Sequence, residues 1–247
     1  MDAATEPALD LEPLPEDWER GIAIVAHPDD LEYGAASAIA RWTDQGKEIA
    51  YVLATEGEAG IDGMLPAEAG PLRREEEIRS AAAVGVHTVE FLGHRDGVIE
   101  YGLPLRRDIA RAIRRHRPDV MIIGNYDERW PWGTPNMADH RAVGLAAIDA
   151  ARDAGNRWVF PELLDEGLEP WPGLRRAFVN AAARARHAVD VTDTIDRGVA
   201  SLQEQKVYLD GLGDARPDPD AFLRGFAEQT GERFGGRPAV AFELLEL

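Results

Sequence analysis

Two short motifs, far apart in the chain, carry the residue types best suited to metal chemistry. The first is Ala-His-Pro-Asp-Asp at residues 26–30, and the second is Asp-His at residues 139–140. Two histidines and one carboxylate with an open fourth position are a recognised arrangement for a catalytic zinc ion. We therefore expect His27, Asp30 and His140 to converge on one metal.

Asp29, the carboxylate between the first two candidate ligands, could have a role different from theirs. Asp29 is adjacent to Asp30 in sequence but should point in a different direction, so it could act as the general base. A metal of this kind lowers the pKa of a bound water from 15.7 toward roughly 7, which makes its proton easy to remove at neutral pH. The competing interpretation is structural, because Pro-Asp is common in turns and Asp30 could cap a following helix.

Composition limits the kinds of site and partner. The chain of 247 residues has no cysteine, so disulfides, thiolate ligands and cysteine nucleophiles are excluded and any metal must be held by nitrogen and oxygen. The net charge of −18 disfavours nucleic acid and anionic membrane surfaces as partners. No apolar run approaches the ~20 residues that span a bilayer, and the acidic N-terminus does not resemble a signal peptide, so we expect a cytoplasmic protein.

The pattern of apolar residues predicts an α/β fold. Strand-like runs alternate with helical spacing, which is typical of a mostly parallel sheet with helices on both faces. The predicted strands are residues 21–26, 48–54, 88–92 and 119–124, and the predicted helices are residues 31–45, 72–84, 105–116 and 139–154. The carboxyl ends of such strands meet at one edge, where ligands bind, so both motifs should lie there.

Outside this regular part the pattern is weaker. Residues 1–20 read as an acidic N-terminal arm on the surface or without fixed structure, and residues 21–247 as one domain. Long connections are predicted at residues 55–71 and 125–138, and loops of that length are often functional. Further predictions are short strands at residues 177–180 and 187–191, a helix from Thr192 to about residue 212, and another from Pro219 to about residue 234. A segment rich in Pro and Trp at residues 156–173 could cover a partner in a homo-oligomer or fold back on its own rim.

These motifs, in their order, resemble those of the PIG-L, or LmbE-like, family of zinc-dependent deacetylases. Besides residues 26–30 and 139–140, the resemblance rests on Arg73-x-x-Glu76, on Ala-Val-Gly-Val at residues 83–86, on Phe-Leu-Gly at residues 91–93 and on Asp96-Gly97. It covers about residues 21–150, with a looser match at residues 189–192. It implies a Rossmann-like α/β fold and hydrolysis of an N-acyl group, usually acetyl, from an N-acetylglucosamine unit.

The resemblance also assigns roles. It implies that His27, Asp30 and His140 bind Zn²⁺, that Asp29 is the general base, and that Arg73 and Asp96 contact the sugar. One residue departs from the family pattern, because Met137 stands where relatives carry a histidine that stabilises the oxyanion. A thioether cannot donate that hydrogen bond, and loss of one such donor typically costs on the order of 10²–10³ in turnover.

Four candidate substrate residues also have structural interpretations. Arg73 and Glu76 lie in a run of charges that could be a solvated helix face with ion pairs, and Asp96-Gly97 alone would indicate a turn. If Arg73 faces the site instead, we expect Glu76 to hold it in place. Trp130 and Trp132 could pack under their loop, but aromatic rings flanked by Pro and Gly also suit stacking on a sugar. We interpret Arg73, Asp96, Trp130 and Trp132 as substrate-binding residues.

The sequence therefore predicts a metal-dependent N-deacetylase that acts on a small-molecule amino-sugar conjugate. Other divalent metals could replace zinc, since a site with two histidines and one carboxylate also accepts iron, cobalt or manganese. Two alternatives remain open. One is a metal-binding relative with weak or no activity because of Met137, and the other is an α/β ligand-binding module in which residues 27–30 form only a turn.

Overall fold

The computed structural model describes residues 10–247, in which strands and helices alternate along most of the chain. The strands are β1 Glu12–Pro13, β2 Arg20–Val25, β3 Glu48–Leu53, β4 Thr88–Phe91, β5 Val120–Ile123, β6 Arg176–Asn180, β7 His187–Asp190 and β8 Ala239–Glu246. The helices are α1 Ala36–Asp44, α2 Pro66–Ala83, α3 Leu103–His116, α4 Ala138–Gly155, α5 Glu162–Asp165, α6 Ile195–Gln203, α7 Lys206–Gly211 and α8 Pro219–Gly231, with a 3₁₀ turn at Gly213–Ala215.

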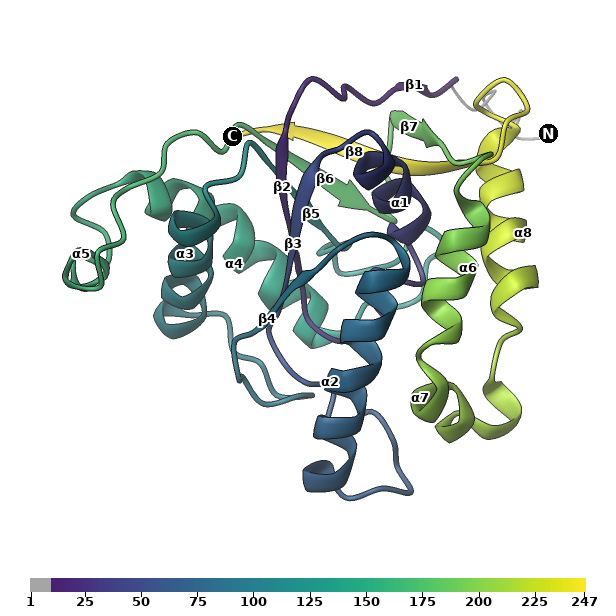
Figure 1. Cartoon of the computed structure of the whole chain (residues 1–247), viewed down its shortest axis with the longest axis horizontal. Coiled ribbons are helices and arrows are strands. Elements are labelled where there is room, and N and C mark those ends of the chain that lie inside the picture. Colours follow the sequence, from purple (N-terminus) through teal and green to yellow (C-terminus); the bar gives the residue numbers. More distant parts are fainter. Residues whose placement is uncertain (1–9) are drawn as a thin grey trace, which may run out of the picture.

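One eight-stranded sheet, in the order β1-β7-β8-β6-β5-β2-β3-β4, joins all the strands of the described residues (Figure 1). Neighbouring strands are parallel except for β8, which is antiparallel to both β6 and β7. The α/β, Rossmann-like class expected from the sequence is confirmed. The direction in which strands are added to the sheet reverses at β2, which pairs with β3 on one side and with β5 on the other. Such a switch point leaves a crevice beyond the carboxyl ends of the two central strands.

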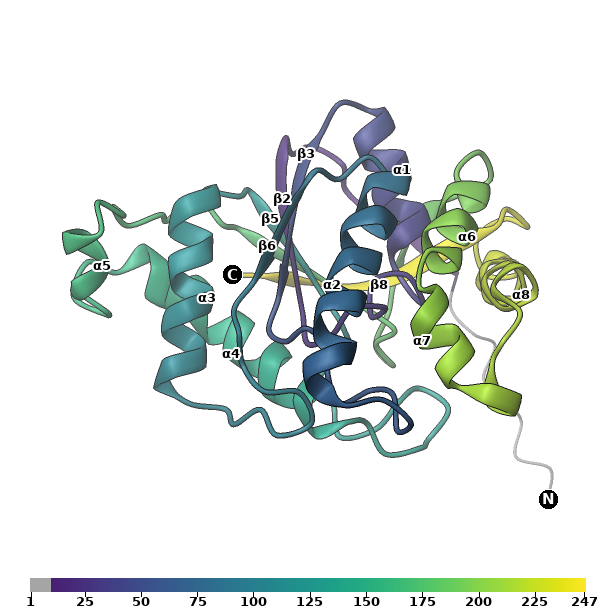
Figure 2. The same ribbon diagram turned by 60° about the horizontal axis from the view of Figure 1, so that its bottom comes forward.

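Helices cover both faces of the sheet, with α3 and α4 on one and α1, α2 and α6 on the other (Figures 1 and 2). Strand β2 is buried on both faces, which explains the unbroken apolar run in its sequence. Ile22 and Ile24 belong to the core under α3 and α4, whereas Ala23 and Val25 belong to the core under α1. Since successive side chains of a strand point to opposite faces, a strand buried on both faces needs apolar residues at every position.

The main element missed by the sequence interpretation is β8. Its residues, Ala239–Glu246, pair with Arg176–Asn180 of β6 and with His187–Asp190 of β7. The pairing joins segments about 60 residues apart, so it could not be predicted from the local sequence. Helix boundaries also shift. The predicted helix from residue 192 is interrupted between α6 and α7, and α2 begins at Pro66, inside the predicted loop, and continues through Pro71.

The predicted arm at residues 1–20 falls partly outside the described residues, which begin at residue 10. From there Leu11, Leu14 and Trp18 are buried, and β1 pairs with β7, so this part packs against the domain. Glu16 ties it to α1, because its carboxylate accepts hydrogen bonds from Arg41 (3.0 Å) and from the indole of Trp42 (2.8 Å). Within residues 10–247, no helix is long and apolar enough to cross a membrane.

Candidate metal centre

The two motifs meet at the switch point. His27 and Asp30 follow β2, and His140 lies in the first turn of α4, which begins after the loop that leaves β5. Ligand atoms of His27, Asp30 and His140 all lie within 4.8 Å of one another. The predicted convergence of these three residues is therefore present in the fold, with the histidine rings 5.2 Å apart between centroids.

The surroundings of His27 indicate which ring nitrogen faces the metal position. Its Nε2 lies 3.1 Å from Asp96 Oδ1 and 3.3 Å from Asp139 Oδ2, so this nitrogen has carboxylate acceptors already. Its Nδ1 lies 3.7 Å from Asp30 Oδ2, toward the other two ligands. Histidines that bind metals commonly donate their second N–H to a carboxylate, which fixes the ring orientation. In this structure Asp96 and Asp139 are the carboxylates placed to accept that hydrogen bond from His27.

His140 is arranged in the complementary way. Its Nδ1 lies 3.0 Å from the side-chain oxygen of Asn136, and its Nε2 lies 3.0 Å from Asp30 Oδ1. That Nε2 is buried and makes no hydrogen bond of acceptable geometry. Buried polar atoms nearly always have a hydrogen-bond partner. A buried ring nitrogen that makes no hydrogen bond and lies beside a carboxylate is therefore a good candidate for a metal ligand.

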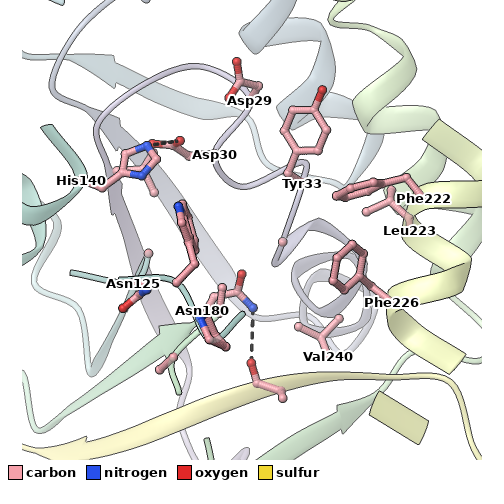
Figure 3. A pocket seen from close by; sticks show the side chains of 18 of the residues that line it. Asp29, Asp30, Tyr33, Asn125, His140, Asn180, Phe222, Leu223, Phe226 and Val240 are labelled. Carbon is pink, nitrogen blue, oxygen red and sulfur yellow. Dashed lines mark hydrogen bonds and ion pairs between the residues drawn. The ribbon is translucent and has the colours of Figure 1, made fainter. Parts of the chain in front are cut away.

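Asp30 does not cap a helix, which corrects the structural interpretation of this residue. Helix α1 begins only at Ala36, and the N-cap position is Ala35. Instead Asp30 Oδ2 accepts hydrogen bonds from the backbone N–H groups of Ala26 (3.0 Å) and His27 (2.9 Å). The carboxylate thus folds back over the end of β2 and is held with its other oxygen toward His140, as Figure 3 shows.

The electrostatic environment favours positive charge at this position. Burial by itself lowers the pKa of His27, but the carboxylates of Asp139, Asp30 and Asp96 raise it to about 12. For His140, burial also acts to lower the pKa, and Asp30 raises it above its ordinary value. In both cases the neighbouring carboxylates dominate. A divalent cation supplies the same positive charge without requiring protons on the rings.

Asp29 is held apart from the ligands. Its backbone adopts φ = 86°, in the left-handed region that residues other than glycine rarely occupy. Its carboxylate forms an ion pair with Arg73 Nη2, and the side chain is nearly buried. Burial raises the pKa of Asp29 to about 6, although the Arg73 guanidinium opposes the rise. A carboxylate with a pKa near neutrality is well matched to accepting and returning a proton.

Arg73 is buried, with only 2% of its surface exposed, and its contacts are made within the protein. Besides Asp29, it donates to the carbonyl oxygens of Gly57 (2.9 Å) and Pro28 (2.7 Å). A Cβ added to Gly57 would lie 2.2 Å from the guanidinium, and Gly57 also has φ = 65°, so glycine is required there. Tyr208 stacks on the guanidinium at 4.3 Å. Glu76 accepts hydrogen bonds from the backbone N–H groups of residues 207–208, so it helps to hold Tyr208 against Arg73.

The remaining predicted site residues line the same cavity as the ligands. Trp130 and Trp132 stack on each other (centroids 5.1 Å apart, 5° between planes), and Trp130 meets the His140 ring edge to face at 5.6 Å. Met137 is half exposed in the cavity wall at the start of α4. The Asn136 side chain is fully engaged, because its amide nitrogen also donates to the carbonyl oxygens of Asn125 and Asp127.

Sequence interpretation missed two supporting residues. Asn136 and Asp139 both precede His140 in the second motif. Asp139 contacts the histidine of the first motif, whereas Asn136 contacts His140 itself. The signal was present, since a buried-looking Asp and Asn in one short motif with a ligand histidine suggest supporting hydrogen bonds. Their individual partners follow only from the fold.

A mostly parallel sheet with this cluster at its switch point defines a class of α/β proteins that can hold a metal between two histidines and a carboxylate. The chain belongs to the PIG-L family, described as GlcNAc-PI de-N-acetylase, whose model matches residues 22–151. It is 31% identical to diacetylchitobiose deacetylase of Thermococcus kodakarensis over 186 residues, which are 73% of this chain and 66% of that relative.

Two further comparisons agree. A 1D-myo-inositol 2-acetamido-2-deoxy-alpha-D-glucopyranoside deacetylase of Kineococcus radiotolerans is 28% identical, with 87% of this chain and 70% of that protein covered. The structure of N,N'-diacetylchitobiose deacetylase from Pyrococcus horikoshii superposes with a TM-score of 0.81 at 26% identity, covering 93% of this chain and 85% of that one. The family resemblance expected from the motifs is confirmed.

Proposed function

We propose that this protein is a metal-dependent hydrolase that removes an N-acyl group from an amino-sugar conjugate. The observation that carries the proposal is the convergence of His27, Asp30 and His140 within 4.8 Å beside a separate, buried Asp29. The names of the relatives support amino-sugar amides as the substrate class.

The donor set fits a zinc ion. His27 Nδ1, an Asp30 oxygen and His140 Nε2 would hold it, leaving a position for water or substrate, which is the pattern of catalytic rather than structural zinc sites. When bound, the metal supplies an acidified water and polarises the amide carbonyl. Asp96 and Asp139 would keep the His27 ring oriented, and Asn136 would do the same for His140.

The proton steps fall to Asp29. Its carboxylate takes a proton as the water oxygen bonds to the carbonyl carbon, and it returns that proton to the nitrogen as the C–N bond breaks, giving a carboxylic acid and a free amine. Arg73 orients Asp29 for both steps through their ion pair. In this proposal Arg73 acts on the substrate through Asp29, and Asp96 through His27, while Trp130 and Trp132 form the wall next to the reacting amide.

The alternative of a metal-binding protein without activity predicts bound zinc but no turnover. The test therefore combines metal analysis with release of free amine from methyl N-acetylglucosaminide, for wild type, His140→Ala and Asp29→Ala prepared identically. We expect about one metal per chain in wild type and in Asp29→Ala, loss of metal in His140→Ala, and a fall in turnover of about 10²–10⁴ in Asp29→Ala.

Equal turnover by wild type and Asp29→Ala would remove Asp29 as the base. A folded wild type that takes up no added zinc would exclude the metal mechanism. The cytoplasmic location and the homo-oligomer expected from the sequence stay predictions.

A further inference from the structure

A second group of polar side chains lies in the interior, where helices α2 and α6 pack against each other (Figure 2). None of these side chains lines the cavity of the candidate metal centre. Each has a relative exposure of 0%. We call the group the internal cluster, and its members are Glu32, Tyr51, Glu77, Ser80, Ser201 and Gln205.

Hydrogen bonds join the two helices at two levels of the cluster. At the first level, the hydroxyl oxygens of Ser80 in α2 and Ser201 in α6 lie 2.8 Å apart, and Ser80 donates to Glu32 Oε1 (2.7 Å). At the second level, Glu77 Oε2 accepts a hydrogen bond from the side-chain nitrogen of Gln205 (2.8 Å), just beyond the end of α6. Since residues three apart on a helix share one face, the carboxylates of Glu32 and Glu77 reach the same interior region.

Four oxygen atoms of the cluster have no hydrogen-bond partner among residues 10–247. They are Glu32 Oε2, Glu77 Oε1, Gln205 Oε1 and the hydroxyl oxygen of Tyr51. Burial raises the pKa of Tyr51, and the charges of Glu32 and Glu77 raise it further, so this hydroxyl lies close to both carboxylates. Unpaired buried oxygens are rare in folded proteins, and four of them in one cluster indicate a bound group.

The two carboxylates also lack a counter-charge. No Lys, Arg or His side chain in the described part of the chain forms an ion pair with Glu32 or Glu77. Burial raises the pKa of Glu32 to about 7. Burial, together with the charge of Glu32, raises the pKa of Glu77 well above its ordinary value. The interior therefore strongly disfavours two negative charges without a positive one.

Protons, water and a cation would act differently on this cluster. Protons on the carboxyl groups would remove the charge, but the Tyr51 hydroxyl would still have no acceptor within hydrogen-bonding distance. Water would contact the oxygen atoms but would leave the charge unbalanced. A single cation would do both, because it neutralises carboxylates and is coordinated by oxygen.

We propose that the internal cluster binds a monovalent alkali cation, Na⁺ or K⁺, through Glu32 Oε2, Glu77 Oε1, Gln205 Oε1 and the Tyr51 hydroxyl. A donor set made only of oxygen suits hard cations and is a poor match for zinc. Mg²⁺ usually keeps several waters, and Ca²⁺ takes about six to eight oxygens. Both fit less well in a closed interior with four free oxygens. This site is separate from the candidate metal centre and does not depend on the proposed hydrolysis.

The internal cluster lies directly behind Asp29. Besides burial, the charge of Asp29 raises the pKa of both Glu32 and Glu77, and the backbone N–H of Asp29 stabilises the Glu77 carboxylate. A cation here would join the turn after β2 to strand β3 and to helices α2 and α6. We therefore expect it to stabilise the fold.

Thermal unfolding in chloride salts of equal ionic strength would test the proposal. Wild type would be compared in KCl, NaCl and choline chloride, because the choline ion is too large to enter the cluster. We expect the Tm to be about 3–6 °C higher in KCl or NaCl when the alkali cation is about tenfold above its Kd. His140→Ala, which disrupts the candidate metal centre, should show the same difference.

The variant Glu77→Gln distinguishes a cation from a proton. If Glu77 only carried a proton, its neutral amide analogue would keep the Tm of wild type in every salt. We expect instead that Glu77→Gln loses the salt dependence and has, in KCl, a Tm no higher than that of wild type in choline chloride. Glu75→Gln, at an exposed position two residues earlier on α2, is the matched control and should keep the dependence.

A second variant removes one donor and leaves both charges in place. Tyr51→Phe deletes only the buried hydroxyl, and we expect it to raise the KCl concentration that gives half of the Tm shift by about tenfold. Tyr101→Phe, whose hydroxyl bonds to Asp149 at the surface, should not change this concentration.

Equal Tm values of wild type in the three salts would overturn the proposal and indicate that protons and water satisfy the cluster. A salt dependence that persisted in Glu77→Gln would also overturn it, because the cation would then bind elsewhere. If Glu77→Gln did not fold, an unchanged KCl requirement in Tyr51→Phe would overturn it in the same way. In crystals soaked in RbCl, the anomalous signal of Rb⁺ should lie among the four oxygens, and Rb⁺ found only at other positions would contradict the assignment.

Discussion

Asp139 Oδ2 lies 3.3 Å from Nε2 of His27, although the two residues are 112 positions apart. The same oxygen accepts the backbone N–H of Gly97 (2.7 Å), and the other oxygen accepts that of Ile99 (3.1 Å). Asp139 therefore joins the second motif, the first motif and the loop after β4. The residue next to the candidate ligand His140 thus contacts the other candidate ligand histidine.

We predict that Asp139→Asn weakens zinc binding by about 10–100-fold, because a neutral amide is a poorer acceptor for the His27 N–H than a carboxylate. Competition against a zinc-chelating dye would measure the change. Asp149→Asn is a matched control on the same helix, where the side chain is 44% exposed and lies outside the metal centre. Unchanged affinity in Asp139→Asn would mean that Asp96 alone is enough to orient the ring.

The Asp29–Arg73 pair gives a prediction about stability. Arg73→Met leaves a buried carboxylate without its partner, which should lower the free energy of unfolding by about 3–5 kcal/mol. Urea unfolding would measure it. Arg74→Met is the control, because the adjacent Arg74 is 45% exposed in its pair with Glu56 and should change stability by no more than about 1 kcal/mol.

The same pair allows a rescue experiment. Adding Asp29→Asn to Arg73→Met removes the unpaired charge, so part of the lost stability should return. If the double variant were no more stable than Arg73→Met, the cost would come from lost packing of the Arg73 side chain.

Met137 gives a prediction about turnover. Met137→His places a hydrogen-bond donor in the cavity wall at the position where the family resemblance implies a histidine, and we expect kcat to rise by a factor on the order of 10². Met137→Leu, which changes the side chain without adding a donor, should give no gain. If Met137→His also gave none, another donor already serves the oxyanion, and steady-state kinetics on methyl N-acetylglucosaminide would show this directly.

Glu16 gives a prediction about pH. Partial burial acts to raise its pKa, but hydrogen bonds from Arg41, Gln45 and Trp42 outweigh this and lower it. A lowered folded-state pKa contributes stability above the unfolded value, and that stability is lost as the pH falls through the folded value. Glu16→Gln should therefore cost about 1 kcal/mol at pH 7.

The difference between Glu16→Gln and wild type should shrink as the pH falls below the ordinary glutamate pKa of about 4.3. Thermal unfolding as a function of pH would follow it. Glu19→Gln, at an exposed position nearby, is the matched control. If the stability difference between Glu16→Gln and wild type stayed constant down to low pH, the cause would be the geometry of the amide and not the loss of the negative charge.

The central strands and the three candidate ligands could be proposed from the sequence because their signals are local. Ile22–Val25 is apolar at each position, and the Ala-His-Pro-Asp-Asp motif ends it abruptly, so a strand that ends in titratable side chains could be predicted from the sequence. The orientation of the ligands was not, because it depends on contacts between distant segments. Asp96, for example, reads as a turn residue or a sugar contact, and only the fold brings it within 3.1 Å of His27.

The apolar part of the cavity wall was equally hard to predict. Phe222 and Phe226 repeat with helical spacing in α8, while Val240 belongs to β8, which no local pattern revealed. Strand β8 lies between β6 and β7 and is antiparallel to both. The sequence predicted the candidate ligands, and the fold adds the cavity wall beside them.

The strand order also determines how copies of this protein can meet. The two edge strands are β1 and β4, and exposed strand edges are templates for joining sheets. One edge is only two residues long and includes Pro13, and the other carries Glu90 in ion pairs with Arg115 and His116. Very short strands, proline and charge all oppose strand pairing between molecules. An assembly of several copies would therefore join through helices and loops, and the sheet would end within each chain.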